Sequence, residues 1–457
     1  MDGMRWQSRP GSQISRRDAL KLGAGTLGAA MLGAAGCAPN AEEAKGGGGG
    51  GGGTLVFLST QLSPVEEAEK MRQKILTDYD GKVDFLGEDF GPFHDRIEAE
   101  AKAGKGTVGV IGGEHGDMAG LAASDRLMDL SDLTQQLADR GFNEDYLELA
   151  KLGGDKPVYI PWMQASYIMV ARKEAMALVP GGADPSKGLT YEQVNAWAKA
   201  IADKEGSKRF GLPLGEDGLV HRFMQGFTYP SFTGGVNTTF KGGDATTMWE
   251  WLKSTWTHAN PQSTSYAFMQ EPLQGGEVWL AWDHVARMIE ALRANPDGFV
   301  AFPAPVGPKG LGYLAVLNGL AIPKTAPNPD ESKKLITYLT DPKTMAVTLR
   351  EVGFFPPTKS ETLPGDLDEG VKAEAAAQAA QAGHAKAIAS LLPVGLGDQE
   401  GPYNDVFRST FEGIVLKNQP IQQALDSGGK RLQGVLDQTK AKCWKPDPES
   451  TGTCKVG

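Results

Sequence analysis

The stretch that decides the fold runs from Leu273 to Lys324 and reads LQGGEVWLAWDHVARMIEALRANPDGFVAFPAPVGPKGLGYLAVLNGLAIPK. It begins with a short apolar run, Glu277–Trp282, followed by a polar turn at Asp283 and His284 and a helical pattern over Val285–Arg293. A turn that ends a strand and opens a helix presents backbone N–H groups and loop side chains to a cleft. We therefore expect Asp283 and His284 to contact a ligand.

The second half of the stretch predicts a crossing between two parts of the molecule. A further apolar run, Phe299–Phe302, leads into a segment rich in proline and glycine over Pro303–Gly312, and an apolar run over Tyr313–Ile322 follows. Proline is poorly suited to a central strand and glycine is permissive, so the middle segment is predicted to be connecting chain. This pattern favours a hinge between two α/β lobes.

Several motifs in this order resemble one protein family. They are the G-E-x-apolar-W pattern of the first run, F-P-A-P-x-G-P-x-G at 302–310, N-G-L-A-I-P-K at 318–324, the helix-like PDESKKLITYLTDP at 329–342 and VGFFPPTKS at 352–360. Together they resemble the extracytoplasmic solute-binding proteins of ABC importers, which include maltose-type and other sugar-binding proteins. The resemblance implies a type II periplasmic-binding-protein-like α/β fold, with two lobes that are each a mostly parallel sheet flanked by helices. It also implies a carbohydrate captured between the lobes and an ABC permease as partner.

The expected domain organisation follows from the order of these patterns. The predicted parts are an export signal at 1–37, a glycine-rich tether at 38–53, lobe 1 at 54–166, lobe 2 at 167–310, a return to lobe 1 at 311–345, and lobe 2 with a C-terminal tail at 346–457.

The N-terminal 37 residues have the features of an export signal. Arg16 and Arg17 precede a weakly apolar Gly/Ala/Leu run from Leu22 to Gly36, which is too short for a mature membrane span. The arginine pair resembles a twin-arginine signal, although Ala19 stands where a large apolar residue is usual. The sequence Ala-Ala-Gly-Cys ending at Cys37 resembles a lipoprotein box, so we expect Cys37 to be lipidated and the protein to be anchored outside the cytoplasm of a bacterium.

Composition and cysteine usage fit an exported protein. Eight consecutive glycines at 46–53 form a flexible tether rather than a packed element. The net charge of −10 argues against a nucleic-acid partner. Besides Cys37, the only cysteines are Cys443 and Cys454, which close a short loop with proline and glycine and are predicted to form a disulfide.

Lobe 1 begins with strand and helix patterns that alternate. Predicted strands at 54–58, 82–86 and 107–111 alternate with helices at 64–79 and 92–103, which indicates a parallel sheet. Ligands bind at the carboxyl ends of such strands. The expected contacts there are Gln61, Glu88, Asp89, Glu114 and His115.

Further candidates come from the crossings and from lobe 2. Trp162 and Trp282 are possible cleft walls, with core packing as the rival role for Trp162, and Asn318 is a polar candidate beside the returning crossing. The aromatic and hydroxyl-rich segment Phe223–Phe240 suits sugar binding or an ordinary surface loop. Its candidates are Tyr229, Ser231 and Phe232.

Other functions stay open from the sequence. A metal importer could use His94, His115 and His284 with Glu114 or Asp283, although no cofactor or metal is expected. A sugar-cleaving enzyme could use Asp89 and Asp283, but the motifs of serine hydrolases, zinc proteases and P-loops are missing, so we expect no enzyme. A polyamine or other cation binder could use Glu88, Asp89, Glu114 and Asp283.

Overall fold

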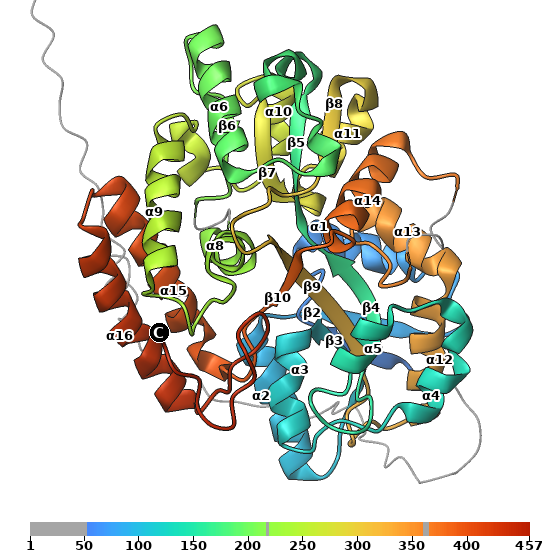
Figure 1. Cartoon of the computed structure of the whole chain (residues 1–457). Helices are drawn as coiled ribbons and strands as arrows, with labels where there is room; N and C mark the ends of the chain where they lie inside the picture. The colour runs from blue at the N-terminus through green and yellow to red at the C-terminus, as the bar shows by residue number, and fades with distance from the viewer. Residues whose placement is uncertain (1–52, 216–218, 360–364) are drawn as a thin grey trace, which may run out of the picture. The chain divides into compact units, whose positions relative to one another are not determined.

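A computed structural model describes residues 53–215, 219–359 and 365–457. The expected export signal, the lipidation of Cys37 and all but the last glycine of the tether lie outside the described residues. Within residues 53–457, side chains gather into buried cores on two β-sheets. We call the part around the six-stranded sheet lobe 1 and the part around the four-stranded sheet lobe 2 (Figure 1).

The sheet of lobe 1 has a parallel half and an antiparallel half. Strand β1 lies between β2 and β3 and is parallel to both, and β9 then pairs antiparallel with β3 on one side and β4 on the other. Strand β10 is parallel to the first residues of β9. The strands are β1 Leu55–Ser59, β2 Val83–Gly87, β3 Val108–Glu114, β4 Ile160–Ala165, β9 Leu311–Ala321 and β10 Ala387–Leu391.

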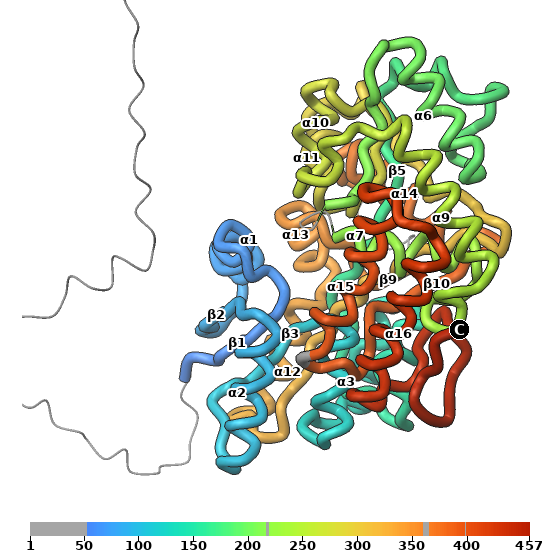
Figure 2. Tube along the Cα trace, turned by 90° about the vertical axis from the view of Figure 1, so that its left-hand side faces the viewer, coloured from blue at the N-terminus to red at the C-terminus, as the bar shows by residue number. Residues whose placement is uncertain are grey.

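Helices flank this sheet because each carries an apolar face that packs on it (Figure 2). Helix α2, for example, buries Phe93 and Ile97 and ends at Gly104, whose positive φ stops the helix. The helices of lobe 1 are α1 Val65–Lys70, α2 Phe90–Ala103, α3 His115–Ala123, α4 Ser131–Gln136, α5 Glu144–Leu149, α12 Pro329–Leu339 and α13 Pro342–Val352, with the π-helix η1 Met71–Ile75 and the 3₁₀ turn η2 Ala138–Arg140.

Lobe 2 is built on a smaller, largely antiparallel sheet. Strand β5 Tyr167–Arg172 pairs antiparallel with β7 Leu280–His284 and β8 Phe299–Phe302, and β6 Phe210–Gly211 is parallel to β7. The α/β class with flanking helices is as expected, whereas this sheet differs from the mostly parallel one predicted.

The helices of lobe 2 include one long segment of continuous helical chain. Helix α7 Val220–Phe223, the π-helix η6 Met224–Thr228 and α8 Tyr229–Thr233 follow one another without a break. The other helices are α6 Tyr191–Glu205, α9 Gly243–Trp256, α10 Gln270–Gly275, α11 Ile289–Ala294, α14 Glu369–Ala382, α15 Glu400–Phe411, the π-helix η12 Glu412–Leu416 and α16 Ile421–Thr439. Short 3₁₀ turns lie at 173–178, 180–182, 185–187, 261–264, 285–287, 296–298 and 397–399.

Three segments carry the chain between the two lobes. Met163 belongs to a lobe 1 core and Ala165 to the lobe 2 core, and the same change occurs between Val352 and Phe355. Along β9, Leu311 and Leu314 pack in lobe 2 whereas Leu320 packs in lobe 1. The crossings therefore lie between Met163 and Ala165, along β9 between Leu314 and Leu320, and between Val352 and Phe355.

Several predicted elements have different bounds in the structure. The helix expected over 64–79 begins after Pro64 as its N-cap residue and ends as a π-helix at Ile75. The alanine-rich composition of residues 369–392 is typical of a helix, but the helix ends at Ala382 and β10 then joins β9. Thr190 and Gln193 form a capping box at the start of α6, because the Thr190 hydroxyl accepts from Gln193 N and the Gln193 side chain accepts from Thr190 N.

Two further features concern the tail and the membrane. Cys443 and Cys454 are joined by a disulfide. The Asp447 carboxylate, within the loop that this disulfide closes, accepts from the backbone N–H groups of Val236, Asn237 and Thr238 and so ties the tail to lobe 2. Among the helices that the structure describes, none combines the length and the apolar character needed to cross a membrane.

Candidate functional site

Polar groups of lobe 1 meet at the carboxyl ends of β1 and β3. The Thr60 hydroxyl, directly after β1, donates to Asp117 Oδ2 at 2.7 Å, and Glu114 N at the end of β3 donates to the same oxygen at 2.9 Å. Gln61 Nε2 donates to Thr60 Oγ1 at 3.3 Å. Because β1 and β3 are parallel neighbours, their ends lie at the same edge of the sheet, which is the usual position of a ligand site.

An ion pair joins this edge to lobe 2. Both terminal nitrogens of Arg222, in α7, donate to the two carboxylate oxygens of Glu114, at 3.1 and 3.3 Å. The Arg222 and Glu114 side chains retain only 20% and 13% of their exposure, so solvent screens this pair weakly. A bidentate pair of this kind fixes the orientation of both side chains and therefore the approach of the two lobes.

Helix α15 adds a third carboxylate from lobe 2. Glu400, at the start of the helix, accepts from Asn404 Nδ2 at 3.4 Å, and Asn404 Oδ1 accepts from Gln225 Nε2 at 3.0 Å. The charge of Glu400 acts on Glu114, Asp117 and Arg222. We call Thr60, Glu114, Asp117, Arg222 and Glu400 the interlobe cluster.

Burial changes the ionisation of two acids of the interlobe cluster, Asp117 and Glu400. Burial, together with the negative charge of Glu114, raises the pKa of Asp117 to about 7. Burial and the same charge raise the pKa of Glu400. Burial disfavours the charged form of Arg222, but Glu114 and the other acidic neighbours outweigh it and raise its pKa. The cluster holds three acidic groups and one basic group, and Asp117 is the acid whose pKa lies near neutral pH.

A groove opens between the lobes, and its walls include Gly116 and Gln399, which directly precede Asp117 and Glu400 in sequence. Its volume is about 310 Å³, and its walls are Phe90 and His94 of α2, Gly116 and Gly120 of α3, residues Gly395–Gly397 and Gln399, and Gln438 and Thr439 at the end of α16. We call it the interlobe groove, since α2 and α3 belong to lobe 1 and α16 to lobe 2. At Gly116 the lobes touch directly, because a Cβ atom there would collide with the carbonyl oxygen of Pro393.

The predicted lobe 1 residues take three different positions. Gln61 and Glu114 are half-buried and belong to or contact the interlobe cluster. Glu88 and Asp89 follow β2 and are exposed. His115 is buried, and its Nδ1 lies 2.9 Å from the Tyr159 hydroxyl in the core of lobe 1. Burial lowers the pKa of His115 to about 4, so the ring is neutral at physiological pH.

Trp162 and Asn318 lie inside the sheet of lobe 1. Trp162 is 1% exposed and packs against Phe57, with ring centroids 5.6 Å apart, as its rival packing role requires. Asn318 is fully buried on β9 opposite Glu114. Neither amide atom of Asn318 has a hydrogen-bond partner among the described residues.

The turn expected at Asp283 and His284 is instead the end of a strand. Both residues belong to β7, which pairs with Tyr167 and Ile168 of β5. Asp283 is fully buried and accepts from the backbone N–H groups of Met269 and His284, at 3.1 and 2.8 Å, and burial raises its pKa to about 7. The predicted turn is wrong because the β5 ladder continues two residues beyond the apolar run.

Trp282 and His284 are enclosed by aromatic rings. The Trp282 ring meets that of Phe223 edge-on, with centroids 4.8 Å apart. His284 packs on Tyr167 and Phe354 at the crossings between the lobes, with centroids 5.4 and 5.8 Å away. Burial and the charges of Arg287 and Arg222 lower the pKa of His284.

The aromatic segment expected as a sugar site or a surface loop is a buried helix as far as Thr233. Tyr229 accepts from Trp249 Nε1 at 3.1 Å and donates to the Phe240 carbonyl at 3.3 Å. Ser231 Oγ accepts from Gly312 N at 2.9 Å, and Phe232 packs on Tyr191. These side chains hold α8 against the core of lobe 2, and none of them lines the interlobe groove described above.

Sequence reasoning missed three members of the interlobe cluster. Arg222 directly precedes the aromatic segment, but its partner lies 108 residues earlier, so no local pattern reveals the pair. Glu400 begins α15 and acts on Asp117 and Arg222, which lie far earlier in the sequence. Asp117 could have been found, because it follows Glu114 by three residues in capping-box spacing.

The described residues also limit the chemistry of the site. They contain no group of three or more His, Cys, Asp and Glu side chains placed to hold a metal ion. The predicted metal alternative required His94, His115 and His284, and of these His115 and His284 are enclosed in separate buried surroundings. What the interlobe cluster offers a molecule is a set of charge-assisted hydrogen bonds from both lobes.

Comparisons with solved structures show the fold. The sugar-binding protein MalE from Xanthomonas citri is 18% identical, with a TM-score of 0.65 over 84% of this chain and 98% of that one. MalE3 from T. maritima with bound maltose is also 18% identical, with a TM-score of 0.65 over 84% of this chain and 100% of that one. UgpB from Mycobacterium tuberculosis, in complex with glycerophosphocholine, is 16% identical, with a TM-score of 0.63 over 85% of this chain and 100% of that one.

Comparisons of sequence identify the family. Curated protein sequences gave no match. The family model of the bacterial extracellular solute-binding proteins matches residues 64–346, which is more than half of the chain. This range includes β2, β3, Glu114 and Arg222, and it ends within α13. The chain belongs to the bacterial extracellular solute-binding protein family.

Proposed function

We propose that this protein captures a carbohydrate between its two lobes and delivers it to an ABC permease. The observation that carries the proposal is the pair of Glu114 and Arg222, which joins the lobes at the carboxyl ends of β1 and β3. A solute that entered here would contact groups of both lobes, and closure over it would exclude water from those contacts. Carboxylate, amide and guanidinium groups are suited to pairing with sugar hydroxyls.

The proposed contacts are polar groups of the interlobe cluster and residues near it in sequence. Asp117 is buried, and the others are exposed or half-buried: Gln61, Glu88, Asp89, Glu114, Arg222, Glu400 and Gln399. Of these, Gln399 lines the interlobe groove. Among the residues predicted from sequence, His115, Trp162, Tyr229, Ser231, Phe232, Trp282, Asp283, His284 and Asn318 are buried and support the shape of the lobes in this proposal.

The carbohydrate class draws support from the structural neighbours. X. citri MalE is a sugar-binding protein and T. maritima MalE3 is bound to maltose, whereas M. tuberculosis UgpB holds glycerophosphocholine. A second candidate is a solute with a cationic group, because Glu114, Asp117 and Glu400 outnumber Arg222 in the interlobe cluster. We also propose that Cys37 carries a lipid anchor, with the glycine tract as a tether to the outer face of the cell membrane.

The test is a thermal-shift screen of residues 53–457 with mono- and disaccharides, glycerophosphodiesters and polyamines. A ligand at a hundred times its Kd should add roughly 2.7 kcal/mol to the free energy of unfolding. A shift with one sugar class supports the carbohydrate proposal. A shift with polyamines alone, weakened by added salt, supports the cationic solute instead.

Arg222→Met is the site-specific variant for this screen, because it removes the pair that joins the lobes. The shift should disappear in Arg222→Met and remain in Lys372→Met, where an exposed cation on α14 is removed from an i,i+3 pair. Recovery of the solute unchanged after incubation distinguishes binding from cleavage, since an enzyme would release products. Loss of the shift in both variants would contradict the assignment of the site.

A further inference from the structure

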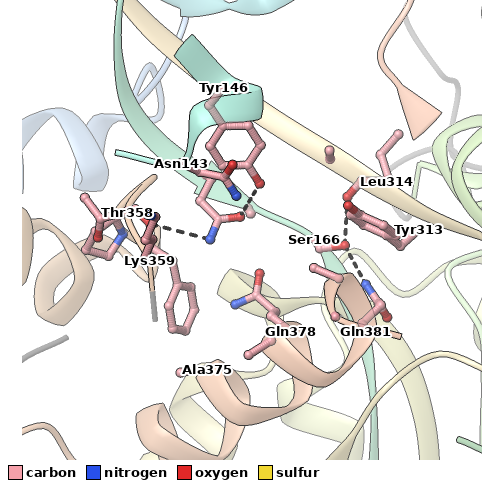
Figure 3. A pocket seen from close by; sticks show the side chains of 18 residues that line it. Asn143, Tyr146, Ser166, Tyr313, Leu314, Thr358, Lys359, Ala375, Gln378 and Gln381 are labelled. Carbon is pink, nitrogen blue, oxygen red and sulfur yellow. Dashed lines mark hydrogen bonds between the residues drawn. The ribbon is translucent and has the colours of Figure 1, made fainter. Parts of the chain in front are cut away.

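A second cavity lies where the chain crosses between the lobes. Its volume is about 300 Å³, and it is lined by residues of all three crossings and of α14 (Figure 3). Asn143, Tyr146 and Gln164 come from lobe 1, whereas Tyr313 and Gln378 come from lobe 2. We call this cavity the hinge pocket. It shares no lining residue with the interlobe groove.

The polar walls of the hinge pocket are mostly satisfied by one another. Tyr146 Oη donates to Gln164 Oε1 at 3.3 Å, and Gln164 Nε2 donates to the Pro356 carbonyl at 3.5 Å. Gln381 Nε2 donates to Ser166 Oγ at 2.9 Å, and that hydroxyl donates to the Leu314 carbonyl at 2.7 Å. These bonds fix the shape of the walls and hold their side chains in place (Figure 3).

Gln378 is the exception. Its side chain extends from α14 into the hinge pocket and is only 7% exposed (Figure 3). Neither its Nε2 nor its Oε1 has a hydrogen-bond partner among the described residues. A buried carboxamide without partners costs about 1–3 kcal/mol per unsatisfied group, so a glutamine here is unfavourable unless something binds to it.

The lining also defines the kind of molecule that fits. A carboxamide offers donors and an acceptor side by side, which is the pairing that a hydroxyl group requires. Lys359 is the one charged lining residue; its side chain is 52% exposed and lies 3.8 Å from Glu144, so the interior of the pocket is neutral. The rings of Tyr146, Tyr313 and Phe355 supply apolar surface. A volume of about 300 Å³ is at the lower limit of small-molecule sites.

We propose that the hinge pocket is a second ligand site, for a neutral molecule with several hydroxyl groups and at most the size of a monosaccharide. Gln378 is the residue that recognises it, by donating to one hydroxyl and accepting from another. The molecule contacts both lobes and all three crossings at once, so it binds the arrangement of lobes seen here. The site is separate from the one proposed for the transported solute and does not depend on the identity of that solute.

The experiment measures binding of glycerol, D-glucose, myo-inositol and sodium acetate to residues 53–457 by calorimetric titration at millimolar concentration. We compare the unsubstituted protein with Gln378→Leu, which keeps the size of the side chain and removes the carboxamide. Gln423→Leu is the matched control, since Gln423 is exposed on α16. Thermal unfolding without probe shows that each variant is folded.

The expected result is that at least one of the three polyhydroxy probes binds and that Gln378→Leu weakens it about tenfold, equivalent to about 1.4 kcal/mol. Gln423→Leu should leave the affinity unchanged. Binding that is lost in Arg222→Met but kept in Gln378→Leu would place the probe at the interlobe cluster and overturn the proposal. Binding of acetate alone, or of no probe, would also overturn it, because the pocket would then hold an anion or only water.

Discussion

The interlobe cluster and the hinge pocket both join lobe 1 to lobe 2, but they do so with opposite chemistry. The interlobe cluster uses charge, with Arg222 bonded to both carboxylate oxygens of Glu114 and further acids close by. The hinge pocket uses neutral amides and hydroxyls, and Gln378 lacks partners among the described residues. Charged contacts depend strongly on pH and on the loss of either partner, whereas neutral contacts do not. The two junctions should therefore respond to different perturbations.

The largest effect is expected when the charge pair is broken on one side. Arg222→Met leaves Glu114 buried without its partner and should lower the free energy of unfolding by roughly 3 kcal/mol, the lower end of the range for buried pairs because both side chains keep some exposure. Denaturant titration measures the change. The double variant Arg222→Met/Glu114→Gln should recover much of the loss, and equal losses in single and double variants would show that the pair contributes nothing.

A fully buried acid on the hinge side should give the next effect. Glu374 lies one helical turn before Gln378 on α14, and neither of its oxygens has a partner among the described residues. Burial raises the pKa of Glu374 well above 4.5. The positive charge of Arg293 opposes this rise, and the negative charge of Glu290 adds to it by a smaller amount. The folded protein then binds a proton that the unfolded chain releases above pH 4.5, so stability falls as pH rises at up to about 1.4 kcal/mol per unit.

Glu374→Gln should remove this dependence. The variant should match the unsubstituted protein below pH 4.5 and exceed it by up to about 3 kcal/mol at pH 7, because it keeps the shape of the side chain and cannot ionise. Unfolding by denaturant across this pH range measures the difference. Glu369→Gln is the control, since Glu369 is exposed on the same helix, and equal effects of both variants would contradict the assignment.

A smaller effect is expected at the close contact between the lobes. Gly116→Ala would push α3 away from the Pro393 carbonyl oxygen, and overpacking of this kind costs about 1–3 kcal/mol. If the lobes approach over the solute, this substitution should weaken solute binding about tenfold. Gly434→Ala, exposed on α16, is the control because nothing lies within 4 Å of its added Cβ atom. Equal affinities of the two variants would show that this contact is not part of the bound arrangement.

The smallest effect concerns Gln378 in the absence of any probe. Gln378→Leu removes no hydrogen bond to a described residue and replaces a buried carboxamide by an apolar side chain of similar size. Its stability should therefore equal that of the unsubstituted protein or exceed it by about 1 kcal/mol or more, since about 1 kcal/mol is the lower end of the cost of one unsatisfied buried group. A loss of stability in thermal unfolding would mean that the carboxamide supports the fold and is not reserved for a ligand.

The fold was predictable from sequence because local patterns carried it. The alternating strands and helices of residues 54–111 and the motif order after Leu273 gave the α/β class and the family. The continuation of β7 through Asp283 and His284 was not predictable, because it depends on pairing with Tyr167 and Ile168, more than a hundred residues earlier.

The residues of the candidate site were predictable from sequence only where they directly follow a strand of the parallel sheet. Gln61 and Glu114 were expected because they follow strands of a parallel sheet. Arg222 and Glu400 were not, since their roles depend on tertiary contacts between lobes. Tyr229 and Phe232 were expected as ligand contacts because their segment has the aromatic and hydroxyl-rich composition of a binding loop. That composition instead packs a helix whose polar atoms bond within the core.

The position of β9 has a consequence for the order in which the chain can fold. Strand β9 lies between β3 and β4, although it is made only after the strands of lobe 2. Until residue 321 has been synthesised, β3 and β4 each have an unpaired edge, because β9, which pairs with both of them, is not yet made. Lobe 1 is thus completed late, through contacts between distant parts of the sequence, which is the condition for slow folding. A fragment that ends before β9 should not yield a stable lobe 1.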